Sequence, residues 1–135
     1  MMDKHDDSIR DEMVRIARDA RANAYAPYSN YSVGACVRTD DGRLYAGCNV
    51  ENASFGMTIC AERTAVVKAV SEGARRFTAI AVAAEGAMPY PCGACRQVLS
   101  EFADGGMIVW ITDGDAIERT ELGALLPYNF IINHQ

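Results

Sequence analysis

Two short blocks of sequence place the strongest constraint on the fold of this chain. The block "ICAER" at 59–63 contains Cys60 and Glu62, and the block "PCGAC" at 91–95 contains Cys92 and Cys95. The chain has five cysteines, and this odd number argues against a fold held only by disulfides and favours metal or thiol chemistry. Any fold of this chain has to account for three thiols and a carboxylate concentrated in these two blocks.

Composition narrows the class of protein. The 135 residues predict a single domain, residues 1–135, and an apolar content of 50% with 23% charged residues is typical of a globular protein. No apolar run approaches the roughly 20 residues needed to cross a bilayer. The polar start "MMDKHDDSIRDE" does not resemble a targeting peptide, so we expect a cytoplasmic protein. The net charge of −5 argues against binding to nucleic acid and favours a small neutral ligand. Without a long apolar run, we expect no membrane partner.

Hydrophobic periodicity predicts an α/β fold. Apolar residues recur every three or four positions from Asp7 to about Ala24, which predicts a helix ended by Pro27. Two strands at 31–39 and 43–50 form a hairpin around "DDG". The remaining expected elements are a helix at 59–71, a buried strand at 77–84, a helix at 92–102, a strand at 107–112, a weak strand at 116–120 and a short helix at 121–127. This order predicts a three-layer α-β-α domain whose mixed sheet begins with an antiparallel pair and continues with parallel strands.

The predicted helix starts bring the three thiols into one site. Cys60 falls at or near the start of one helix, and Cys92 and Cys95 fall in the first turn of the next. A helix amino terminus stabilises a thiolate, and residues three apart in a helical turn point to the same side. Successive helices on one face of a sheet start close together, so the three thiols could hold one ion. Three protein ligands are typical of catalytic zinc, which keeps a position for water, whereas structural zinc usually has four.

A fourth ligand is not evident in the sequence. His5 and His134 lie at the extreme ends of the chain, and Cys36 and Cys48 each sit alone in a strand pattern, where a free thiol behaves as a small apolar residue. Glu62 lies two residues after Cys60, close enough to take a proton from a water bound to the metal. The arrangement C-x-E followed by P-C-x-x-C is the pattern of the zinc nucleobase deaminases.

The stretches "CNVENASFGMTICAERTAVVKAVSEG" and "PCGACRQVL" resemble the small cytidine deaminases, a homotetrameric class that acts on free nucleosides, and the likeness runs from about Tyr25 to Phe130. The resemblance implies a five-stranded mixed sheet between helices and one Zn²⁺ per subunit on Cys60, Cys92 and Cys95. It also implies hydrolysis of cytidine and 2'-deoxycytidine to uridine and 2'-deoxyuridine, with release of ammonia, in pyrimidine salvage. Hydroxide activated by zinc would attack C4 of the base, with Glu62 as the proton shuttle.

Zn²⁺ with three thiolates carries a net charge of −1, so we expect a positive group nearby: Arg63, next to Glu62, could hydrogen-bond the sulfurs, and Arg96 could assist it. The resemblance implies roles for further residues. Asn49 and Glu51 in "NVEN" alternate along a predicted strand and match positions that bind the ribose hydroxyls. The other implied substrate-binding positions are Tyr31, Phe55, Ala61 and Phe130. At Tyr31 the family commonly has a Phe that stacks near the base, and at Phe55 a Tyr is frequent. Phe130 matches an aromatic residue that the family contributes to the pocket of a neighbouring subunit.

Three alternatives compete with this interpretation. A deaminase of another aminopyrimidine, such as the blasticidin S class, shares the zinc motif, but the "NVEN" ribose signature argues against it. A polynucleotide cytidine deaminase agrees less well with this sequence, because such enzymes usually have a His zinc ligand and a basic surface that binds along the nucleic-acid strand. A zinc-stabilised binding module without turnover would need a fourth protein ligand, Cys36 or Cys48.

Overall fold

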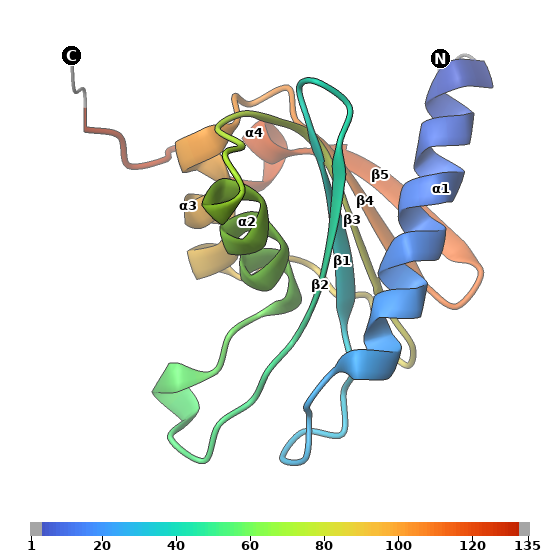
Figure 1. Ribbon diagram of the computed structural model, residues 1–135, viewed down its shortest axis with the longest axis vertical. Helices are drawn as coiled ribbons and strands as arrows, with labels where there is room; N and C mark the ends of the chain where they lie inside the picture. Colours follow the sequence, from blue (N-terminus) through green and yellow to red (C-terminus); the bar gives the residue numbers. More distant parts are fainter. Residues whose placement is uncertain (1–3, 133–135) are drawn as a thin grey trace.

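The computed structural model describes residues 4–132, with side chains described from Asp6 onward. The chain forms three layers around a five-stranded sheet (Figure 1). Helix α1 (Lys4–Ala20) covers one face of the sheet, and helices α2 (Ala61–Ser71), α3 (Gly93–Phe102) and α4 (Leu122–Leu125) lie on the other. The predicted three-layer α-β-α architecture is confirmed.

The sheet is mixed, as the sequence predicts, and begins with an antiparallel pair. Its strands are β1 (Gly34–Thr39), β2 (Leu44–Cys48), β3 (Phe77–Ala84), β4 (Ile108–Asp113) and β5 (Ala116–Glu121), in the spatial order β2-β1-β3-β4-β5. Strands β2, β3 and β4 run in one direction, as predicted, because α2 joins β2 to β3 and α3 joins β3 to β4. Strand β1 lies between β2 and β3, so β3 and β4 are the one pair of parallel neighbours among these five strands, and the other three pairings are antiparallel.

Element boundaries differ from the predictions where the chain leaves the sheet to form the site. Helix α1 ends at Ala20 and continues as the 3-10 turn Arg21–Asn23, before Pro27 is reached. Strand β1 begins at Gly34 rather than at residue 31, and β2 ends at Cys48 rather than at residue 50. Residues 31–33 and 49–51 therefore lie in loops, so Asn49 and Glu51 are not part of a strand as predicted.

The core has one apolar layer on each side of the sheet. Strand β3 lies between both layers, which explains its continuous apolar sequence "FTAIAVAA". The layer under α1 contains Met13, Ala17, Cys36 and Trp110, among others. The layer under α2 and α3 contains Val37, Val66, Ile80, Val82, Leu99 and Ile111, among others. Leu99 is fully buried while Val98 and Phe102 are partly buried against this layer, so the predicted inward face of α3 is confirmed.

Glycine lets β2 and α2 approach closely. A Cβ atom at Gly47 would lie 2.4 Å from the backbone nitrogen of Ala65 and 2.7 Å from the carbonyl oxygen of Ala61. No residue with a side chain fits at this position without a shift of the backbone. The first turns of α2, which follow Cys60, are therefore held directly against the sheet.

The hairpin and helix ends use the conformations expected from the sequence. Gly42 in the β1–β2 turn has a φ of 89°, and Gly73 after α2 has a φ of 105°. Both values are favourable for glycine and strained for other residues.

No helix within residues 4–132 has both the length and the apolar character needed to span a membrane.

Candidate metal centre and active site

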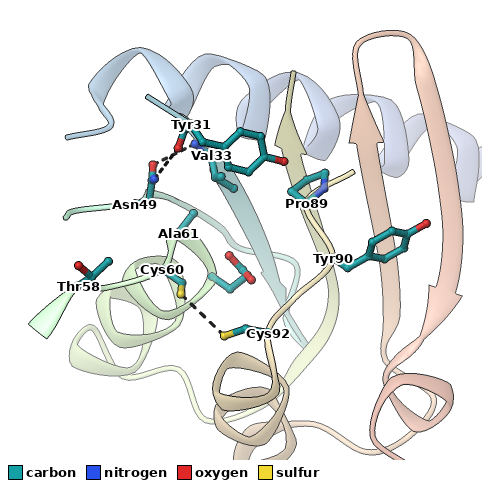
Figure 2. Close-up of a pocket in the computed structure, with 10 residues that line it drawn as sticks. Tyr31, Val33, Asn49, Thr58, Cys60, Ala61, Pro89, Tyr90 and Cys92 are labelled. Atoms are coloured by element: carbon teal, nitrogen blue, oxygen red, sulfur yellow. Dashed lines mark hydrogen bonds between the residues drawn. The ribbon is translucent and has the colours of Figure 1, made fainter. Parts of the chain in front are cut away.

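Three thiols from two helix starts form one cluster. Cys60 is the N-cap residue of α2, Cys92 is the N-cap residue of α3, and Cys95 lies in the first turn of α3. The Cys60 and Cys92 Sγ atoms are 3.9 Å apart (Figure 2), the Cys92 and Cys95 Sγ atoms are 3.3 Å apart, and all three lie within 4.8 Å of one another. Tetrahedral zinc with Zn–S bonds of about 2.3 Å separates its sulfurs by about 3.8 Å. The cluster therefore fits a zinc ion.

The cluster leaves one coordination position for a non-protein ligand. Between residues 6 and 132, it is the one group of three or more Cys, His, Asp or Glu side chains close enough to share an ion. Cys36 is buried in the layer under α1, on the opposite face of the sheet, and Cys48 lines a small separate hollow beside Lys68. The side chain of His5 and all of His134 lie outside the described residues. This geometry favours a catalytic site over the four-ligand structural site of a binding module.

Arg63 provides positive charge beside the thiols. Its Nη2 donates hydrogen bonds to the Cys60 Sγ at 3.7 Å and to the carbonyl oxygen of Thr58 at 3.0 Å. In the metal-free protein, hydrogen bonds from the Cys95 thiol and from Arg63 lower the pKa of Cys60 to about 5. The hydrogen bond to Cys60 and burial together raise the pKa of Cys95. The Arg63 guanidinium therefore stabilises the thiolate form of Cys60.

Replacing Arg63 by glutamine is expected to weaken zinc binding by about 10- to 100-fold, the usual effect of losing a partner of a metal ligand. The reason is that three thiolates and one Zn²⁺ carry an excess negative charge, which the guanidinium offsets. The rate of zinc transfer to a chromophoric chelator measures this change. Arg75→Gln is the matched control, because Arg75 bonds carbonyl groups at the far end of α2. Equal zinc retention in both variants would contradict the role of Arg63.

Glu62 lies next to the cluster and is almost completely buried. It is in the first turn of α2, is 5% exposed, and lines a cavity of about 170 Å³ together with Cys60 and Cys92. Burial raises the pKa of Glu62 to about 7 in the metal-free protein, and the charge of Cys60 adds to this rise. A carboxyl group that titrates near neutral pH can both accept and donate a proton.

We call this 170 Å³ space the first cavity. Loops enclose it on two sides. Figure 2 shows Tyr31, Val33 and Asn49 on one side and Pro89 and Tyr90 on the other. Asn49 is buried, and its amide group is held by the loop: its Oδ1 accepts from the Val33 nitrogen at 3.0 Å and its Nδ2 donates to the Tyr31 carbonyl oxygen at 2.8 Å. Asn49 thus fixes one side of the first cavity.

A second cavity of about 350 Å³ adjoins the first at Thr58, which lines both. Its other lining residues are Tyr28, Ser29, Glu51 and Phe55. The Glu51 carboxylate accepts hydrogen bonds from the Tyr28 nitrogen at 2.9 Å, the Ser29 nitrogen at 3.1 Å and the Ser29 hydroxyl. The hydrogen bond from the Ser29 hydroxyl, with those from the backbone, holds the pKa of Glu51 below its ordinary value, so this carboxylate stays charged.

Two predicted residues lie away from these cavities. Phe130 lines neither cavity; its backbone is paired with the Gln97 side chain, and its own side chain is 68% exposed. Arg96 bonds the carbonyl oxygens of Pro91 at 2.7 Å and Leu125 at 2.9 Å rather than the sulfurs, so its suggested helper role is not supported. Sequence reasoning missed the lining residues Val33, Thr58, Pro89 and Tyr90, which carry no motif and whose positions depend on how the loops fold together.

Comparison with known proteins identifies the family. A family model described as "Cytidine and deoxycytidylate deaminase zinc-binding region" matches residues 7–111, which include both cysteine blocks. The chain belongs to this deaminase family. It is therefore a zinc-dependent deaminase by family, and the resemblance seen in its motifs is confirmed.

Relatives of this deaminase cover nearly all of the chain. The cytidine deaminase of Sporosarcina psychrophila is 50% identical over 123 residues, which are 89% of this chain and 90% of the relative. The crystal structure of the Burkholderia pseudomallei cytidine deaminase matches with a TM-score of 0.84 and 44% identity, over 96% of this chain and 100% of that chain. That of the Mycobacterium tuberculosis cytidine deaminase matches with a TM-score of 0.80 and 41% identity, over 90% and 97%. The five-stranded deaminase fold is thus confirmed as well.

Proposed function

We propose that this chain hydrolyses cytidine and 2'-deoxycytidine to uridine and 2'-deoxyuridine with release of ammonia. The observation that carries this proposal is the buried Glu62 carboxyl group in a cavity that is also lined by Cys60 and Cys92, two of the three clustered thiols. The relatives named cytidine deaminase, which match this chain over most of its length, support a pyrimidine nucleoside as the substrate.

The proposed metal ligands are Cys60, Cys92 and Cys95. Zinc held there would supply a Lewis acid that lowers the pKa of a bound water molecule toward neutrality. Arg63 limits the loss of acidity that three thiolates would cause, because its guanidinium hydrogen-bonds Cys60 and draws electron density from the sulfur.

Glu62 moves the protons of the reaction. Its carboxylate accepts a proton from the attacking water and donates it to N3 of the pyrimidine ring while the new C4–O bond forms. It then takes the second proton of that oxygen and gives it to the exocyclic amine, so that the C4–N bond breaks and ammonia leaves. One carboxylate serves both transfers because the steps are sequential. Its burial keeps bulk water from competing for these protons.

The two cavities accommodate the two halves of the substrate. The first cavity is smaller than the roughly 300 Å³ at which small-molecule sites begin, so a nucleoside has to extend into the second. We place the base beside Glu62, with Tyr31 against it and the first backbone N–H groups of α2 at Ala61 available to a base carbonyl. The ribose then reaches Glu51 and Phe55 in the second cavity, past Asn49, which lines the first.

We further propose that the active form is a cytoplasmic homotetramer serving pyrimidine salvage. Large apolar side chains remain exposed around the second cavity, including Tyr25, Phe55 and Met57, and along the end of the chain, including Phe130 and Ile131. Such a concentration of aromatic and methionine side chains is typical of a protein interface. Sedimentation at about four times the chain mass of 14.7 kDa would support the tetramer, and a monomer active at full rate would exclude it.

The direct test is ultraviolet absorbance of cytidine and 2'-deoxycytidine with purified protein, together with zinc analysis. We expect one zinc per chain and turnover of both nucleosides. Chelation should remove zinc and activity together, and added Zn²⁺ should restore both. A fully zinc-loaded protein that leaves both nucleosides unchanged would overturn the proposed function.

A further inference from the structure

The Tyr31 hydroxyl joins the two sides of the first cavity. It donates a hydrogen bond of 2.6 Å to the carbonyl oxygen of Ala87. Tyr31 belongs to the loop before β1, whereas Ala87 belongs to residues 85–91, which we call the connecting segment because it joins β3 to Cys92. Figure 2 shows the Tyr31 ring directed toward Pro89 on the opposite side of the cavity. The bond therefore links the loop on one side of the cavity to the segment on the other side.

The connecting segment has no regular structure of its own and leads directly to Cys92. It contains no helix or strand, and the Cys92 side chain that follows it is exposed. Its other attachments are bonds of Gly86 to Asp113, Glu85 to Arg21, Tyr90 to Glu118 and Pro91 to Arg96. None of these four bonds ends on a side chain that lines the opposite side of the cavity. The Tyr31 hydroxyl makes the direct bond from the connecting segment to a cavity-lining side chain, whereas Glu85 reaches the same loop through Arg21, which donates to the Ser32 carbonyl oxygen at 2.9 Å.

Tyr31 is itself held firmly enough to act as an anchor. Its backbone nitrogen donates to the Ser29 hydroxyl at 3.0 Å, and its carbonyl oxygen accepts from the Asn49 side chain at 2.8 Å. Burial and the Asp113 carboxylate raise the pKa of Tyr31, so the hydroxyl keeps its proton and remains a donor at neutral pH. The donor is thus fixed to the loop that also carries the Asn49 contacts.

We propose that Tyr31 is a positioning residue whose hydroxyl sets the width of the space in which the pyrimidine base lies. This inference rests on the proposed function, and it concerns the phenol oxygen rather than the ring. Without the bond to Ala87, the ring and the connecting segment could vary in separation. A smaller fraction of molecules would then have the geometry that fits the base, and the apparent affinity would fall in proportion to that fraction.

Tyr31→Phe tests the proposal because it removes the hydroxyl and keeps the ring. We expect KM for cytidine to rise about fivefold, the effect of one ordinary hydrogen bond, while kcat stays within about twofold. Amide hydrogen exchange should become faster at Gly86 and Tyr90, whose amide groups are hydrogen-bonded, and stay unchanged in the strands. Zinc content should be unchanged, because Arg96 still holds the residue before Cys92.

Tyr45→Phe is the matched control, since its hydroxyl bonds only Arg43 in the exposed hairpin region and lines neither cavity. Unchanged KM and unchanged exchange in Tyr31→Phe would overturn the proposal and leave the ring as the only contribution. Faster exchange throughout the sheet would overturn it too, by showing a general loss of stability. The exchange measurement needs no turnover, so it remains decisive even if the unmodified protein does not deaminate cytidine.

Discussion

Glu62→Gln should yield a folded, zinc-loaded protein in which deamination is slower by about 10²- to 10⁴-fold, the range contributed by a positioned general acid–base group. Glutamine has nearly the shape of glutamate but can neither accept nor deliver a proton at this position. The three thiols are untouched, so the metal should remain. Steady-state kinetics with cytidine, zinc stoichiometry and circular dichroism measure the three parts of this expectation.

The effect of Glu62→Gln should fall on kcat rather than on KM, because proton transfer occurs only as the reaction proceeds. Glu72→Gln is a suitable control, since it makes the same chemical change just after α2, at an exposed position far from the cysteines. Full activity of Glu62→Gln with a normal zinc content would remove the proton-shuttle role. Loss of zinc in this variant would instead show that the carboxylate supports the metal site.

Gly47→Ala is expected to destabilise the fold by about 3 kcal/mol or more, at the upper end of the cost of overpacking. The new Cβ would meet the backbone of α2 at 2.4 Å and 2.7 Å, and backbone atoms cannot move aside without displacing the helix. Because α2 begins beside Cys60, this displacement should also disturb the thiol cluster. Thermal unfolding and zinc content of the purified variant measure both consequences.

Gly56→Ala provides the matched control for Gly47→Ala. A Cβ at Gly56 would meet no atom within 4 Å, and Gly56 does not have the positive φ that favours glycine. The same substitution should therefore leave stability almost unchanged there. An unfolding midpoint for Gly47→Ala equal to that of Gly56→Ala would show that the β2–α2 contact is looser than the structure indicates.

The thiol cluster could be predicted from sequence because it depends on local signals. Cys60, Cys92 and Cys95 are placed by two helix starts, and helix starts are visible in the periodicity of the residues that follow. Two helices on the same face of a sheet then bring these starts together. The buried position of Glu62 follows from the same helix, because its first turn faces the cavity.

The loops around the cavities could not be predicted, because long-range side-chain bonds fix their shape. Asn49 ends the regular pairing by bonding Val33, and Tyr31 bonds Ala87, which is 56 residues away. Arg96 has the positive charge needed to offset the thiolates, but it donates its hydrogen bonds to the carbonyl oxygens of Pro91 and Leu125 instead. The position of β1 between β2 and β3 could not be predicted for a similar reason, since the order of strands is set by the sheet as a whole and not by any one strand.

The three sulfurs differ in their access to solvent: Cys95 is buried in the core, Cys60 is partly covered, and Cys92 is exposed. Cys60 and Cys92 also line the first cavity, so the open side of the cluster is the side on which a substrate would sit. An occupant of the cavity would therefore block the route by which an ion escapes. Metal retention and nucleoside occupancy are then kinetically linked, and the enzyme would keep its ion longest while it is saturated with substrate.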